Sequence, residues 1–197
     1  MNRLRLLLAL VAILTVGWVQ TAAAEVKVTF YTHGWGVGAN GVTYFPHAFI
    51  RVEGTPTGGE AVDRTFGFTA TDLSTAMTDR PGIVKPVNGD GYLEDSTPHF
   101  SVIASDDQYR ALLEKITWWM TPEGATYNLK RRNCIHFVAE MAALVGLTPG
   151  TTKTLKPGLF MSDTIKKNAG KLTLINATAK PEAPAPVDVD ALEKAGS

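Results

Sequence analysis

Asn133-Cys134-Ile135-His136-Phe137-Val138-Ala139-Glu140-Met141 is a run that predicts an amphipathic helix with the chain's single cysteine in its first turn. Asn133 is a favourable N-cap, apolar residues recur after it at helical spacing, and Gly146 supplies a C-terminal stop. Free backbone N–H groups and the helix dipole stabilise a thiolate there, and the basic run Lys130-Arg131-Arg132 precedes it. The run therefore predicts a nucleophilic thiol with a lowered pKa, against the alternative of a small buried side chain.

Upstream of this helix, the sequence is rich in predicted strands. Residues 26–32, 42–52 and 64–69 are β-branched, aromatic and alternating, and 100–104 can form one more strand. Turn-forming residues crowd the stretch 53–60, which predicts an antiparallel hairpin between the second and third strands. The stretch 71–98 has few apolar runs and several Gly, Pro and Asp residues, so we expect most of it to be loop.

The second half of the chain is predicted to be helical. Ser105 and Gln108 have the spacing of a capping box, apolar residues follow on one helical face, and Pro122 ends the pattern. A last short helix is expected to begin after Ser162 and to end near Gly170. Strands followed by helices predict an α+β fold in which a mostly antiparallel sheet packs against helices.

The two ends of the chain differ in composition from its middle. Arg3 and Arg5 precede an apolar stretch that ends in small residues, so 1–24 is predicted to be a cleaved signal peptide, with an uncleaved anchor as the alternative. Residues 179–197 are Pro-rich and acidic and are predicted to be a disordered tail. One domain over 25–178 remains. We therefore expect a periplasmic or secreted protein with no membrane span after cleavage.

Composition also limits the partners and cofactors. The 19 basic and 19 acidic residues balance, which argues against a nucleic-acid partner, and no Cys/His cluster suggests a metal or another cofactor. A single cysteine cannot form an internal disulfide, so an exported thiol is buried, paired between chains or kept for chemistry. The glycine pattern at 36–41 precedes a predicted strand instead of a helix, which excludes a dinucleotide-binding loop.

A thiol nucleophile needs a base, and the four histidines differ in their fitness for that role. His47 lies in an apolar strand segment, where alternation groups it with Phe49 and separates it from its two neighbours in sequence. We predict it to be the base, against the alternative of a histidine held by backbone hydrogen bonds. His136 is expected to point away from the thiol by about half a helical turn, and His33 and His99 are expected to be ordinary surface residues.

His47-Ala48-Phe49-Ile50, followed later by Asn133-Cys134-Ile135-His136-Phe137-Val138, resembles the circularly permuted NlpC-type branch of the papain-like superfamily. The cysteine run is also similar to the Asn-Cys-Glu-His-Phe-Val signature of lecithin:retinol acyltransferase-like enzymes, with Ile135 in place of the acidic residue. The resemblance implies a permuted papain-like fold in which Cys134 is the nucleophile and His47 the base. It also implies a polar third residue, often on the strand after the histidine strand, for which Thr65 and Asp63 are both candidates.

These residues predict an exported cysteine amidase or endopeptidase that works through a thioester on Cys134. Its substrate would be a peptide or another acyl compound, and in a bacterial host the peptides of peptidoglycan are the obvious amides outside the cytoplasm. A lipid or thioester acyl hydrolase on the same scaffold is one alternative, and an inactive binding module is another. Polar and basic residues at 127–132 favour a peptide, although Trp118 and Trp119 would form an interfacial patch if both were exposed.

Overall fold

The computed structural model describes residues 25–34, 36–37, 43–44, 46–72, 74, 76–86 and 91–175. The predicted signal peptide over 1–24 and the predicted tail over 179–197 lie outside the described residues. The elements follow one another as β1 (Glu25–His33), β2 (Gly36–Val37), β3 (Thr43–Tyr44), β4 (His47–Thr55), β5 (Val62–Ala70), β6 (Arg80–Lys85), β7 (Thr97–Ala104), α2 (Asp106–Trp119), β8 (Thr126–Tyr127), α3 (Cys134–Leu144), α4 (Pro157–Lys167) and β9 (Thr173–Leu174).

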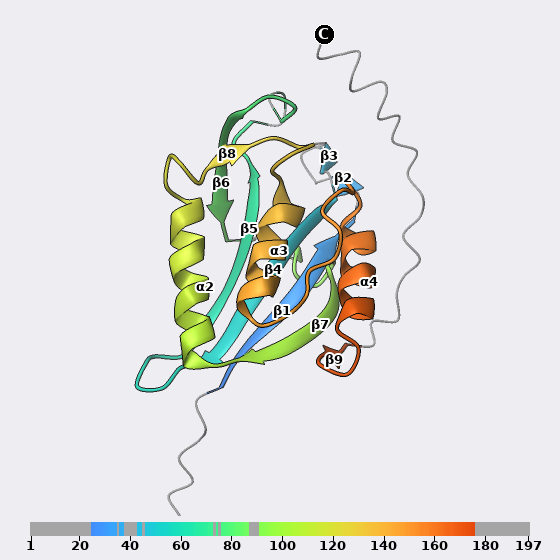
Figure 1. The fold of residues 1–197 in the computed structure, drawn as a ribbon. Coiled ribbons are helices and arrows are strands. Elements are labelled where there is room, and N and C mark those ends of the chain that lie inside the picture. The colour runs from blue at the N-terminus through green and yellow to red at the C-terminus, as the bar shows by residue number, and fades with distance from the viewer. Residues whose placement is uncertain are drawn as a thin grey trace, which may run out of the picture.

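Seven strands form one sheet in the order β8-β6-β5-β4-β1-β7-β9, and every neighbouring pair is antiparallel. The short strands β2 and β3 form a separate two-stranded sheet. Helices α2, α3 and α4 all lie on one face of the large sheet (Figure 1). This arrangement confirms the predicted α+β fold with an antiparallel sheet packed against helices.

The sheet buries alternate residues against those helices. Even-numbered positions of the central strands, such as Val28 and Ile50, belong to the main hydrophobic core together with the apolar residues of the helices. Odd-numbered positions face the opposite side, where the Tyr31 and Phe49 rings stack with centroids 5.1 Å apart. The His47 ring stacks on Phe49 at 6.2 Å, which confirms that these two residues share a face.

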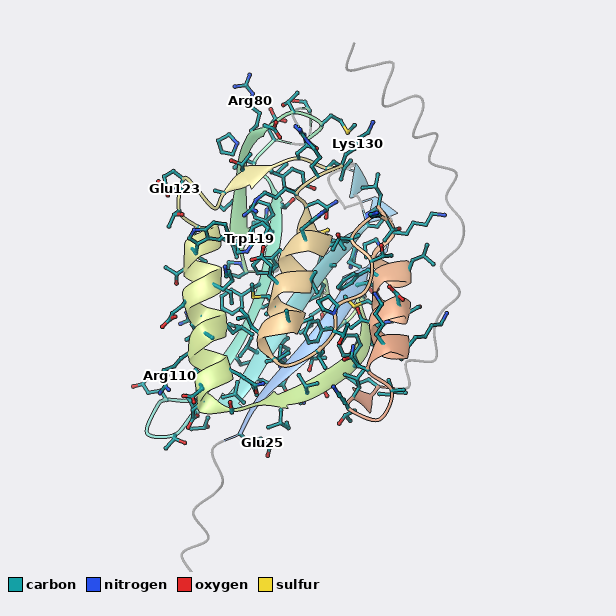
Figure 2. All side chains as sticks on the ribbon, in the orientation of Figure 1. Glu25, Arg80, Arg110, Trp119, Glu123 and Lys130 are labelled. Atoms are coloured by element: carbon teal, nitrogen blue, oxygen red, sulfur yellow. The ribbon has the colours of Figure 1, made fainter. Side chains whose placement is uncertain are left out.

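The caps of α2 and α3 agree with the sequence. Ser105 and Gln108 form a capping box at the start of α2, and Asn133 is the N-cap of α3. The Trp119 ring packs edge-on against Phe137 with centroids 5.4 Å apart, which joins the end of α2 to α3. Figure 2 shows Trp119 between these two helices. This contact fixes α3 over the sheet beside β4 and β5.

Two predicted elements need correction. The stretch expected to be mostly loop contains β6, whose Gly82 lies so close to β5 that an added Cβ would stand 2.6 Å from the Phe68 ring. Helix α4 begins at Pro157 instead of after Ser162, because proline is favoured in the first turn and Phe160 is buried in the core. Both elements are specified by tertiary contacts that the local pattern does not contain.

Candidate active site

The first turn of α3 is fixed by the side chain of its N-cap. The Asn133 Oδ1 atom accepts hydrogen bonds from the backbone N–H groups of Ile135 at 2.9 Å and His136 at 3.4 Å. Its Nδ2 atom donates to the carbonyl oxygen of Leu129 at 2.6 Å. Because Asn133 is almost completely buried, these bonds hold the turn that carries Cys134 in a single orientation.

The loop before α3 is tied to a distant part of the chain by Asn128. The Nδ2 atom of this buried residue donates to the carbonyl of Met77 at 3.2 Å and to the Asp79 carboxylate at 3.1 Å. Its Oδ1 atom accepts from the backbone N–H groups of Lys130 at 3.0 Å and Arg131 at 3.2 Å. The position of the cysteine helix therefore depends on contacts between segments far apart in sequence.

Cys134 lies where two neighbouring strands separate. The last residue pair between β4 and β5 is Ile50 with Phe66, and from Gly67 onward β5 pairs with β6 instead. Ala48 lies two residues beyond that last pair, and its backbone N–H donates a hydrogen bond to the Cys134 sulfur. The structure thus brings the thiol against the residue that follows His47 in sequence.

The thiol is neutral at physiological pH. Cys134 is 6% exposed, and burial raises its pKa to about 11, although the backbone N–H groups of Ala48, Ile135 and Cys134 itself act against this. Two of the basic neighbours have other partners: Arg131 pairs with an Asp79 oxygen, and Arg132 lies 3.8 Å from the Trp119 ring centroid. The predicted lowering of the thiol pKa is therefore wrong, because burial outweighs the helix terminus.

His47 is also neutral. Burial lowers its pKa to about 4, and the nearby positive charges of His33 and Lys85 add to that shift. In the part of the chain that the structure describes, the hydrogen bonds of the Cys134 sulfur come from backbone N–H groups and none joins it to the His47 ring. The ring and the sulfur approach β4 from opposite faces at the first two residues of the strand.

Neither candidate for the third residue lies beside His47. Thr65 is buried opposite Arg51, and Asp63 is opposite Glu53 on the same pair of strands. At about 3.3 Å per residue, these positions are roughly 13 and 20 Å along β4 from His47. The Asp63 carboxylate is bound by the Arg51 guanidinium through hydrogen bonds of 2.8 and 2.9 Å.

His33 is the residue that the strand register places opposite His47. It is partly buried, its ring stacks on Tyr92 with centroids 3.9 Å apart, and its Nδ1 atom is 3.1 Å from the Ser96 hydroxyl. His99 is also partly buried and is 2.8 Å from the Thr32 hydroxyl, so the expectation of two ordinary surface histidines is wrong. The predicted strand over 26–32 ends one residue before His33. Extending that strand by one residue would have placed His33 in the sheet opposite His47.

The remaining predictions about side chains have mixed outcomes. His136 is held at the N-cap, with Nδ1 3.1 Å from Asn133 Oδ1. Trp119 is fully buried, whereas Trp118 is 38% exposed and has the Lys115 ammonium 4.7 Å above its ring. The two tryptophans therefore do not form a shared interfacial patch.

A membrane-spanning helix and a metal site each have requirements against which the described residues can be compared. No helix among the described residues is both long enough and apolar enough to cross a membrane. The same part of the chain has no group of three or more His, Cys, Asp and Glu side chains placed to hold a metal ion. Comparisons of the chain with protein-family models, with curated proteins and with solved structures give no match.

Proposed function

We propose that this protein is an exported cysteine hydrolase that cleaves amide bonds in peptides, with Cys134 as nucleophile and His47 as general base. The observation that supports this most directly is the hydrogen bond from the Ala48 N–H to the Cys134 sulfur. It joins the start of β4, which carries His47, to the start of α3, although these two elements are far apart in the sequence. A thiol at a helix N-terminus and a neutral imidazole on the strand that the helix contacts are the two groups that acyl transfer requires.

The chemistry begins from a neutral thiol and a neutral imidazole. His47 removes the Cys134 proton while the sulfur attacks the substrate carbonyl carbon, which forms an imidazolium and a tetrahedral oxyanion. The imidazolium gives that proton to the leaving amine as the C–N bond breaks, and a thioester remains. His47 then deprotonates a water molecule, which attacks the thioester and releases the carboxylic acid and the thiol.

Backbone N–H groups supply the electrostatic stabilisation in this mechanism. Those of Ala48 and Ile135 already donate to the sulfur, so they stabilise the negative charge that develops on it as the proton leaves. The Cys134 N–H lies at the same helix terminus and would donate to the oxyanion of a bound substrate. No ionised thiolate is needed in the resting enzyme.

The His47 ring has a route to the sulfur. Among the described residues, β5 no longer pairs with β4 at this level, so the edge of β4 beside Ala48 has no neighbouring strand. A change of the χ1 rotamer of His47 would turn the ring toward this edge, which the Cys134 sulfur contacts at Ala48. Catalytic hydrogen bonds are commonly formed only when substrate is bound, which is consistent with their absence in the free protein.

A peptide fits the surroundings of this pair better than a lipid does. Lys85 lies close enough to His47 to affect its pKa, and the buried position of Trp119 removes half of the apolar patch that a lipid surface would need. We therefore propose the peptides of peptidoglycan as substrates, with a periplasmic or secreted location.

Replacement of the nucleophile tests the proposal. Cys134→Ala should abolish the release of new amino termini from peptidoglycan stem peptides, while the free energy of unfolding falls by only about 1 kcal/mol. His99→Gln is the matched control, since it changes another partly buried histidine and should retain activity. Full activity in Cys134→Ala would exclude the thiol mechanism. Hydrolysis of a phospholipid or long-chain thioester that needs both His47 and Cys134, without peptide cleavage, would assign the site to lipids.

A further inference from the structure

His136 is the third residue of α3, and its ring closes a capping box on the N-cap residue Asn133. Glutamine or glutamate is the usual residue at this position, because its side-chain oxygen accepts the backbone N–H of the N-cap. Here the Nδ1 atom of His136 lies 3.4 Å from the backbone nitrogen of Asn133 and takes the place of that oxygen. An imidazole nitrogen accepts a hydrogen bond only while it carries no proton, so this box depends on the protonation of the ring.

The same Nδ1 atom also lies 3.1 Å from the Oδ1 atom of Asn133, which is an acceptor. Oδ1 has two lone pairs, and it already accepts from the backbone N–H groups of Ile135 at 2.9 Å and His136 at 3.4 Å. A neutral ring therefore carries its proton on Nε2 and accepts from the N-cap N–H. A protonated ring can only donate from Nδ1, so it competes with these two N–H groups for Oδ1 and gives up its bond with the Asn133 N–H.

The surroundings of His136 oppose its protonation at neutral pH. Burial is the largest cause of its lowered pKa, and the Arg132 guanidinium adds to the shift, while Glu140 acts against it. The Glu140 carboxylate is shared with the Lys115 ammonium of α2 at 3.7 Å and with the Trp119 ring N–H at 3.0 Å. The positive end of the helix dipole also disfavours a cation in this turn. The ring is therefore neutral at pH 7 and gains a proton only in acid.

We propose that His136 is a pH-sensitive switch of the active site: the neutral ring closes the cap of the cysteine helix, and the protonated ring opens it and disables the thiol. The inference rests on the proposed function, in which Cys134 attacks from the first turn of α3. The N–H of Ile135 links the cap to the nucleophile, because it donates both to Asn133 Oδ1 and to the Cys134 sulfur. A turn that loses the first of these bonds no longer holds the sulfur in one orientation.

Two substitutions at His136 separate the hydrogen bond of the cap from the charge of the ring. Folding lowers the pKa of His136, so the closed cap is complete above about pH 6.5 and is lost as the pH falls through the folded value. His136→Gln keeps an acceptor at this position and cannot be protonated, so at pH 5.5 it should retain at least about threefold more of its neutral-pH kcat than the wild type does. His136→Ala lacks the acceptor at every pH, so its kcat at pH 7 should already be about threefold lower or less.

NMR titration of the wild-type protein is the readout that does not depend on turnover. The backbone amide signals of Asn133 and Ile135 should shift with the same midpoint as the His136 ring, and this transition should disappear in His136→Gln. Amide signals that do not follow the ring overturn the proposal. An acid limb of the kcat profile that is the same in His136→Gln and in the wild type also overturns it.

His99→Gln, which changes another partly buried histidine, is the control and should keep the wild-type kcat profile. If His136→Gln does not fold, the titration of the wild-type amides is decisive by itself. Activity that survives in Cys134→Ala refutes the proposed function and leaves the NMR result on the cap standing.

Discussion

Cys134 receives opposing electrostatic influences, and their relative sizes determine its charge. A helix N-terminus favours an anion by about 0.3–1 kcal/mol, and by up to about 2 kcal/mol in partly buried geometries. Removal of a charge from water costs several kcal/mol unless a counter-charge accompanies it, and Arg131 and Arg132 are directed to Asp79 and Trp119. The desolvation cost is larger, so the thiol keeps its proton.

Alkylation of the native protein should therefore be slow. With a thiol pKa of about 11, the thiolate fraction at pH 7 is about 10⁻⁴, against about 3% for free cysteine. Iodoacetamide should modify Cys134 at least about 300-fold more slowly than free cysteine, with a rate that increases up to pH 11, as followed by mass spectrometry. The denatured protein, as the control, should react like free cysteine. A native thiol that reacts faster than free cysteine at pH 6 would contradict the assigned burial.

At the scale of elements, the site is the junction of the α3 N-terminus with the start of β4. Its local half can be predicted from the sequence: the Asn133 cap, the helix that follows and the face shared by His47 and Phe49 all depend on residues within a few positions of one another. The other half depends on pairing between distant segments. The separation of β4 from β5 and the register of β1 against β4 have no local signal, so the sequence alone offers Thr65 and Asp63 as third residues and cannot show that both lie far along the sheet from His47.

The cap of α3 should matter more to the thiol than an equivalent cap elsewhere. Asn133→Ala removes the hydrogen bonds of a buried side chain, so it should cost about 1–2 kcal/mol in urea unfolding and raise the alkylation rate of Cys134 by fraying the first turn. Ser105→Ala, which removes the N-cap of α2, is the matched control. If the control accelerates alkylation of Cys134 as much as Asn133→Ala does, local fraying is not the cause.

For the whole molecule, the two neutral groups of the site limit stability at opposite ends of the pH scale. The folded state lowers the pKa of His47 to about 4, so its contribution is present above about pH 6.5 and is lost as the pH falls toward 4. The folded state raises the pKa of Cys134 to about 11, so that contribution is present below about pH 8.5 and is lost as the pH rises toward 11. Each contribution is about 3 kcal/mol.

Urea midpoints measured across the pH range should show both limits. His47→Gln should flatten the acid side of the profile only in part, because burial also lowers the pKa values of His33, His99 and His136. Cys134→Ala should flatten the alkaline side and leave the acid side as it is. A Cys134→Ala profile that coincides with the wild-type profile above pH 9 would show that the thiol ionises equally easily in the folded and unfolded chains.

The central place of β1 in the sheet affects the time course of folding. This strand precedes every other described element, yet one of its two neighbours is β7, which is synthesised only after β6. Folds dominated by such distant pairings form in milliseconds to seconds, and the helix that carries Cys134 comes later still along the chain. Until α3 docks, the thiol is therefore open to water and to any oxidant of the compartment in which the chain folds. Faster folding, for example with the help of a chaperone, shortens the time before α3 docks. A larger fraction of the protein then reaches its native state with an unoxidised sulfur.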